Sequence, residues 1–195
     1  MAAMADPLTT RLLDHALADP ANAAILARLP ELGLDDCWLV AGCICGPVWN
    51  ALSGQPPAAH VRDYDIFYWD PDTSWEAEDA VIARADIVFG DLGIVHEVRN
   101  QARVPLWFQE HFGRPYPATA CSADNIAAFV VAGTSIGLRP DVHGGHEVCA
   151  PWGLEDLFAG ILRPNPRNPT PDRFAAKCAS YQARWPWLEI ARTGR

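Results

Sequence analysis

The stretch Arg62-Asp63-Tyr64-Asp65-Ile66-Phe67-Tyr68-Trp69-Asp70 decides how the rest of this chain is interpreted. Its apolar and aromatic residues predict a β-strand over residues 61–69, closed by the turn residues that follow. Side chains alternate across a strand, so Asp63 and Asp65 project from the same face. Two adjacent carboxylates repel each other unless a cation lies between them, and Mg²⁺ prefers such hard oxygen ligands. The pair is therefore either a metal site or a solvated strand start with Asp63 paired to Arg62.

Upstream of this strand, residues 37–42 form a short apolar run that ends in Gly42 and predicts a buried strand. A helix is expected to follow, beginning at Gly46-Pro47 and ending at Gly54. Gly42 and Cys43, between strand and helix, are candidates for phosphate binding. Glycine lets a backbone approach a phosphate closely, and a helix N-terminus offers unpaired N–H groups. An ordinary strand-to-helix turn explains the same residues.

Downstream, residues 94–99 predict a third strand that carries Glu97. If this strand lies beside the strand with the two aspartates, Glu97 completes a cluster of three carboxylates; otherwise it is an ordinary exposed strand residue. Arg99, Asn100 and Arg103 follow, and these side chains could neutralise the charge of a triphosphate. Salt bridges on an acidic protein are the alternative for the two arginines.

The remaining pattern predicts an α+β fold: a small mixed β-sheet with helices packed on it and a helical C-terminal portion. Seventeen Pro and fourteen Gly imply many turns and exclude a bundle of long helices. Further helices are expected over residues 7–18, 20–29, 74–85, 101–112, 122–132, 154–162 and 171–184, and a hairpin pairs residues 135–139 with 147–150. We expect a single domain over residues 1–195, with the catalytic motifs at 38–103 and a helical and hairpin portion at 120–190.

The charge balance restricts the partners. The chain carries 24 Asp and Glu against 15 Lys and Arg, a formal net charge of −9. Binding of extended nucleic acid requires clustered basic residues, so such a partner is disfavoured. The N-terminus lacks the pattern of a secretory signal, and the longest apolar stretch, residues 127–138, is too short to span a bilayer. We expect a cytoplasmic protein without membrane contact, whose six cysteines are free thiols.

Two other constellations are weaker. His143, His146 and Cys149 flank Gly144-Gly145, which predicts a hairpin tip, and without a fourth ligand a zinc site is disfavoured. Cys43 could act as a nucleophile with one of the histidines, but it lies in no recognised nucleophile motif.

The motifs together resemble the polymerase-β-like nucleotidyltransferase superfamily, whose pattern is matched here by Ala41-Gly42-Cys43, Asp63-Tyr64-Asp65 and the later Glu97. More closely, the chain resembles a bacterial family of nucleotidyltransferase-like proteins. The matching stretches lie at residues 41–50, 63–70, 98–103, 150–158 and 163–166, so they cover most of the chain. Two features depart from the superfamily: Cys43 replaces the usual Gly or Ser, and the gap between Gly42 and Asp63 is longer than usual.

The resemblance implies transfer of a nucleoside monophosphate from an NTP to an acceptor, with Mg²⁺ or Mn²⁺ as cofactor and release of pyrophosphate. Asp63, Asp65 and Glu97 would be the metal ligands, with Glu97 alternatively the base. Nucleotide-binding residues would be Gly42, Cys43, Arg99, Asn100 and Arg103. The acidic balance favours a small molecule or a protein as acceptor over extended nucleic acid. Two alternatives stay open: a non-catalytic nucleotide- or protein-binding relative, and another metal-dependent phosphotransferase or hydrolase.

Overall fold

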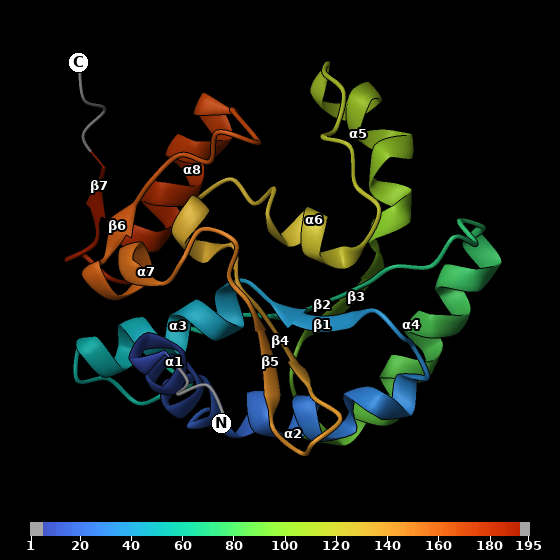
Figure 1. Cartoon of the computed structure of the whole chain (residues 1–195), viewed down its shortest axis with the longest axis horizontal. Coiled ribbons are helices and arrows are strands. Elements are labelled where there is room, and N and C mark those ends of the chain that lie inside the picture. Colours follow the sequence, from blue (N-terminus) through green and yellow to red (C-terminus); the bar gives the residue numbers. More distant parts are fainter. Residues whose placement is uncertain (1–5, 192–195) are drawn as a thin grey trace.

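The computed structural model describes residues 6–191 and centres on a five-stranded sheet in the order β3-β2-β1-β4-β5 (Figure 1). The strands are β1 (Cys37–Val40), β2 (Tyr64–Tyr68), β3 (His96–Asn100), β4 (Gly137–Pro140) and β5 (His146–Cys149). β2 and β3 are parallel and the other neighbours are antiparallel. The sheet is therefore mixed, and the predicted α+β fold and the hairpin of β4 and β5 are confirmed. β2 is shorter than expected, since residues 61–63 and Trp69 lie outside it.

Two capped helices lie under the sheet. α1 (Pro7–Leu17) and α2 (Pro20–Arg28) begin where aspartates precede prolines, and the Asp19 carboxylate accepts a hydrogen bond from the Ala21 N–H at 3.0 Å. This is the N-cap that the Asp19-Pro20 pair predicts. Asp19 is fully buried and also accepts a hydrogen bond from the Tyr64 hydroxyl at 2.9 Å. The cap therefore ties α2 to β2 as well as starting the helix.

The helix after β1 begins earlier than the sequence predicts. α3 spans Gly42–Leu52, so Pro47 lies inside it and not at its start. Proline has no N–H and leaves the carbonyl four residues before it unpaired. Here that carbonyl belongs to Cys43, and it accepts a hydrogen bond of 2.7 Å from the Asn22 side-chain amide of α2. A tertiary contact thus compensates for the proline, which is why the expected boundary at Gly46 was wrong.

The remaining elements complete the cover of the sheet. The helices are α4 (Trp75–Phe89), α5 (Val104–Phe112), α6 (Ser122–Ile126), α7 (Glu155–Ala159) and α8 (Pro171–Gln182). A second small sheet pairs β6 (Ile161–Leu162) with β7 (Glu189–Ile190), and 3₁₀ turns lie at η1 (Leu29–Leu32), η2 (Gly90–Leu92), η3 (Gln101–Arg103) and η4 (Ala132–Thr134). None of the helices in residues 6–191 combines the length and the apolar character that a membrane crossing requires.

Two predicted helices are shorter than expected. The helix expected over residues 122–132 ends at Ile126, because the amides of Asn165 and Asn168 bind the carbonyls that a helix would have used. Asn165 donates to the carbonyls of Ala127 and Phe129, and Asn168 to that of Ala128. The helix expected over residues 154–162 ends at Ala159, since Gly160 takes the left-handed conformation (φ 70°) and the chain continues into β6.

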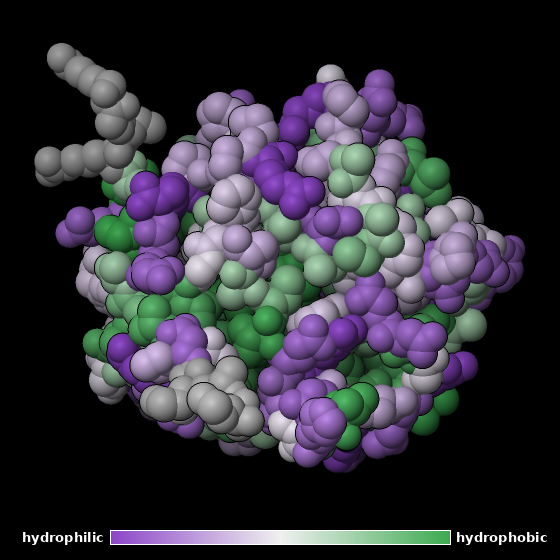
Figure 2. All heavy atoms as spheres, viewed as in Figure 1, coloured by the Kyte–Doolittle hydropathy of each residue, from purple (hydrophilic) through white to green (hydrophobic). Residues whose placement is uncertain are grey.

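The two faces of the sheet differ. Tyr64, Ile66 and Tyr68 of β2 point into the main hydrophobic core, which α1, α3 and α4 share. The alternate residues point to the opposite face, where Phe67 packs in a small apolar cluster with Trp38, Val40 and Ile126. Figure 1 places α5, α6 and α8 on this side, and Figure 2 shows hydrophilic residues over the ends of α5 and α8. Asp65 alternates with the core residues and therefore faces the side of α8.

Candidate active site

A cavity of about 600 Å³ opens on the face of the sheet that carries Asp65. Its floor is formed by β2 and β3, and its walls by α4, α5, α8 and the segment around Phe129. Asp65, Glu97 and Arg99 line it, together with Ala41 at the start of α3. Segments that are far apart in the sequence thus meet here, with acidic, basic and aromatic side chains on one surface.

The first acidic element is the Asp65–Glu97 pair. The parallel register of β2 and β3 places Asp65 beside Glu97, so the two side chains leave the sheet on the same face. Asp63 lies one residue before β2 and is exposed. The strand with Glu97 therefore lies directly beside the strand with Asp65, whereas a cluster of all three carboxylates stays a prediction. The roles of the three carboxylates as metal ligands stay a prediction.

The Asp65 carboxylate is in an unfavourable environment for its charged form. Burial raises its pKa from 3.8 to about 6, and the charges of Asp63 and Glu97 add to this effect. Lys177 on α8 acts in the opposite direction. Within residues 6–191 no backbone or side-chain group donates a hydrogen bond to this carboxylate. A half-buried carboxylate beside like charges and without donors has the properties of an open cation ligand.

The residues present fit a divalent ion in their chemistry. Carboxylate oxygens are the ligands that Mg²⁺ prefers, and a cation would relieve the repulsion that raises the pKa of Asp65. Across the described residues 6–191, however, no three His, Cys, Asp or Glu side chains meet closely enough to hold a metal ion by themselves. Mg²⁺ commonly completes its coordination with water and substrate phosphates. The site therefore fits an ion that binds together with a nucleotide.

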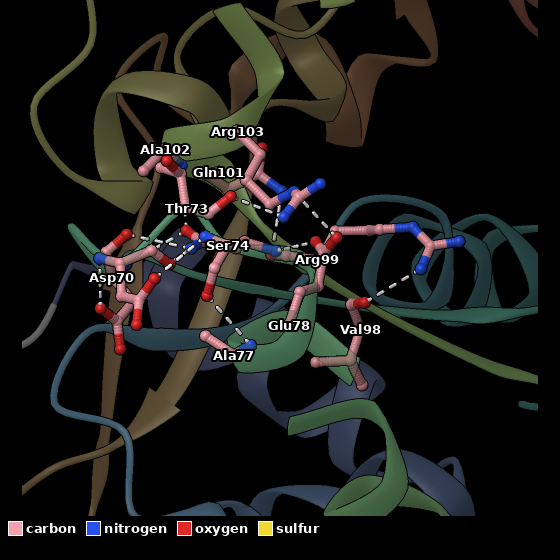
Figure 3. Close-up of polar contacts among 12 residues, drawn as sticks. Asp70, Thr73, Ser74, Ala77, Glu78, Val98, Arg99, Gln101, Ala102 and Arg103 are labelled. Atoms are coloured by element: carbon pink, nitrogen blue, oxygen red, sulfur yellow. Dashed lines mark hydrogen bonds and ion pairs between the residues drawn. The ribbon is translucent and has the colours of Figure 1, made fainter. Parts of the chain in front are cut away.

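The three polar side chains after β3 have different surroundings. Arg99 is half exposed and lines the cavity, and its Nε lies 3.0 Å from Glu97 Oε1. Arg103 is buried: its Nε lies 3.0 Å from Glu78 Oε2, and its guanidinium donates to the Thr73 carbonyl at 2.7 Å. Figure 3 shows Arg103 turned toward Glu78 and Thr73, whereas Arg99 extends away from this network. Only Arg99 of the two arginines is thus free to approach a ligand without breaking a buried pair.

Asn100 is also engaged in the fold. Its buried side chain accepts hydrogen bonds from the N–H groups of Asp70 and Ala102, and it donates to the carbonyls of Asp70 and Asp72. The three bonds to Asp70 and Asp72 tie the loop after β2 to the end of β3, and the bond from Ala102 caps the turn that follows β3. These contacts give Asn100 and Arg103 structural roles.

The turn between β1 and α3 offers backbone N–H groups to the site, and not side chains. The Cys43 thiol is buried and donates to the Val40 carbonyl at 3.2 Å, and burial raises its pKa well above the usual range. Ala41 has φ 62° and ψ −123°, a conformation that L-residues rarely adopt and that marks strain at functional sites. Gly42 is half-buried, with open space where a Cβ would lie. The N–H groups at the start of α3 are therefore the part of this turn that suits an anion.

One helix face in the cavity was missed at the sequence level. Arg173, Lys177 and Tyr181 of α8 all line the cavity, at the four-residue spacing that aligns side chains along a helix. Lys177 is the only lysine of the chain. The four-residue spacing could have shown that these side chains share one face of a helix. No local pattern indicates that this face lies opposite Asp65, which precedes it by more than a hundred residues.

Aromatic side chains form the wall opposite α8. Trp75 begins α4, Trp107 and Phe108 belong to α5, and Tyr116 lies in the loop after it; all four line the cavity. Arg103 stacks on Trp75, with its guanidinium carbon 3.9 Å from the ring centroid, so one face of the indole is fixed. The Trp75 residue as a whole is still 69% exposed. A planar ligand could stack on these rings.

Comparisons with known proteins identify the family of the chain and a similar fold. Residues 27–190 match a protein family described as nucleotidyltransferase, and the chain belongs to that family. A solved NMR structure that reveals a CCA-adding enzyme head domain is similar at 28% identity and a TM-score of 0.74, over 94% of this chain and 96% of that one. A tRNA-processing enzyme in an apo form is more distant, at 14% identity and a TM-score of 0.45, over 86% of this chain and 45% of that one. No curated protein matches the sequence.

Proposed function

We propose that the protein is a metal-dependent nucleotidyltransferase that moves a nucleoside monophosphate from an NTP to an acceptor and releases pyrophosphate. The observation that carries the proposal is the Asp65–Glu97 pair, aligned across two parallel strands at the floor of a cavity. Membership of a nucleotidyltransferase family supports this chemistry over other phosphoryl transfer.

The site residues have two roles: carboxylates that would bind the metal, and donors that would bind the triphosphate. Asp63 and Asp65 would hold Mg²⁺ or Mn²⁺, with Glu97 as third ligand or as the base that takes the acceptor proton. A bound ion of this kind supplies positive charge to the triphosphate and lowers the pKa of the attacking hydroxyl. Lys177 and the backbone N–H groups of Gly42 and Cys43 would bind the triphosphate. The acceptor oxygen forms a bond to the α-phosphorus as the bond to pyrophosphate breaks.

The charge of the chain favours a small molecule or a protein as acceptor. An RNA end is the third class of acceptor to consider. A formal net charge of −9 opposes binding of extended RNA, because affinity for its backbone depends on clustered cations. The aromatic wall of the cavity suits a compact acceptor with a planar or apolar part.

A non-catalytic nucleotide-binding relative is the second candidate. It is favoured by Cys43, whose thiol is buried and cannot act as a phosphate-binding hydroxyl. It is also favoured by the spacing of the described carboxylates, which do not form a metal cluster by themselves.

A labelling screen decides between the two. The protein is incubated with each of the four α-³²P-labelled NTPs, with Mg²⁺ or Mn²⁺, and with fractionated cell extract. Transfer predicts a labelled acceptor and stoichiometric pyrophosphate with wild type and not with Asp65→Asn. Arg139→Gln is the matched control, because Arg139 is half-buried and paired to Glu147 on the β4–β5 hairpin. Nucleotide binding without label in any fraction would support the non-catalytic candidate.

A further inference from the structure

The far end of the cavity carries cations that the fold does not neutralise. Arg173 lies in the first turn of α8, and Arg114 lies in the loop after α5. Neither has a carboxylate partner within the part of the chain that the structure describes, although acidic residues outnumber basic ones by 24 to 15. Arg167 is nearby, with a single ion-pair contact to Asp124 at 4.0 Å.

These arginines lie near enough to Tyr116, a residue that lines the cavity, for their charges to act on its hydroxyl. Burial raises the pKa of Tyr116 to about 12, and the positive charges of Arg173, Arg167 and Arg114 partly oppose that rise. For Arg173, burial lowers the pKa of the guanidinium, and the charge of Arg114 lowers it further. Like charges are thus held together next to a substrate-sized cavity, an arrangement that costs free energy until an anion binds.

Aromatic rings fix the two guanidiniums in place. The Arg173 guanidinium carbon lies 4.4 Å from the centroid of the Phe112 ring, and that of Arg114 lies 5.1 Å from the centroid of Phe108. Arg114 also donates to the Asn168 side-chain oxygen, but its Nε is buried without any acceptor. A stacked guanidinium keeps its edge available for the two parallel hydrogen bonds that a phosphate or carboxylate accepts.

The position of the two arginines relative to Asp65 indicates which part of a substrate they would bind. Lys177 lies one helical turn after Arg173, about 6 Å along α8, and it is close enough to Asp65 to influence the pKa of that carboxylate. Arg173 therefore lies on the same cavity, beyond Lys177 from the carboxylates. Arg114 lies beside it, hydrogen-bonded to Asn168, which also lines the cavity.

We propose that Arg114 and Arg173 form an oxyanion site that binds a phosphate or carboxylate group of a substrate seated in the cavity. The anion is either the terminal phosphate of the nucleotide or an acidic group of the acceptor. The inference rests on the proposed function for the identity of the cavity as the substrate site.

Isothermal titration calorimetry with inorganic orthophosphate, without metal or nucleotide, tests the site directly. Wild type and Arg139→Gln should bind orthophosphate equally, since Arg139 also stacks on an aromatic ring, Trp38, but pairs with Glu147. The double variant Arg114→Gln/Arg173→Gln should bind at least about tenfold more weakly, because charge-assisted hydrogen bonds are lost. Arg173→Gln alone, in the first turn of α8, should lose a large part of this affinity, and it tests the site if the double variant does not fold.

Orthophosphate binding that is absent in wild type, or unchanged in Arg173→Gln, would overturn the proposal. A second titration with orthophosphate, in the presence of Mg²⁺ and saturating NTP, distinguishes the terminal phosphate of the nucleotide from an acidic group of the acceptor. Displacement of orthophosphate assigns the site to the terminal phosphate, and undiminished binding assigns it to the acceptor. Because neither titration measures transfer, a failure of the oxyanion site and a failure of the proposed function give different results.

Discussion

Asp65 and Glu97 lie side by side on the parallel strands β2 and β3, and both side chains face the cavity under α8. Parallel register makes this relationship rigid, because a shift of one residue would turn either carboxylate into the opposite face of the sheet. The pair therefore has a fixed geometry before any ligand binds, as electrostatic binding sites require.

Asp65 should lower stability near neutral pH. Burial and the neighbouring charges raise its pKa to about 6 in the folded protein, against an ordinary value of 3.8. The folded state therefore holds the proton more tightly, so unfolding free energy falls as pH rises from about 4 to about 6 and stays low above that. Asp65→Asn should remove this dependence and raise metal-free stability at pH 7 by on the order of 1–3 kcal/mol. Urea denaturation of both proteins from pH 4 to 8 measures the difference; a variant less stable than wild type at pH 7 would contradict it.

Nucleotide and metal together should stabilise the wild type through Asp65. A ligand at a hundred times its dissociation constant raises the unfolding free energy by about 2.7 kcal/mol. We expect a shift of this size in thermal melts with Mg²⁺ and the preferred NTP, and no shift in Asp65→Asn. Arg139→Gln serves as the control and should keep the full shift. If Asp65→Asn keeps it as well, this carboxylate has no part in nucleotide binding.

Arg99 and Arg103 should respond to substitution in opposite ways. Arg103 and Glu78 form a buried ion pair, so Arg103→Ala leaves an uncompensated charge and should cost about 3–5 kcal/mol of stability. Arg99 and Glu97 form a half-exposed pair, and Arg99→Ala should change stability by about 1 kcal/mol or less. Chemical denaturation of the two variants measures both effects. Equal losses would show that the contacts of Arg103 do not have the structural role assigned to them.

Asn22 and Pro47 should be energetically coupled. Asn22→Ala removes the hydrogen bond to the Cys43 carbonyl and should cost about 1–3 kcal/mol, because that buried acceptor loses its partner. An alanine at position 47 supplies the helical N–H that proline lacks. Asn22→Ala should therefore cost less in a Pro47→Ala background, and a double-mutant cycle of unfolding free energies gives the coupling directly. Strict additivity of the two changes would refute the compensation.

The local elements of this protein are determined by its sequence. Asp65 in β2, the cap at Asp19 and the β4–β5 hairpin follow from strand alternation and from residue preferences at turns and helix ends. These are properties of a short stretch of backbone, and they remain the same whatever the rest of the chain does. The resemblance of the motif order to nucleotidyltransferases belongs to the same level, and the family match agrees with it.

Tertiary structure decided which of these residues share a site. It paired Asp65 with Glu97, placed Lys177 and Arg173 of α8 over the cavity, and gave Arg103 a buried partner in Glu78. It also moved the start of α3 to Gly42, since the amide of Asn22 compensates for Pro47. Such pairings depend on packing and hydrogen bonds between segments separated by many residues, and no local pattern encodes them. The sequence was therefore sufficient to identify the candidate carboxylates. Only the tertiary structure decided which cationic side chains lie opposite them.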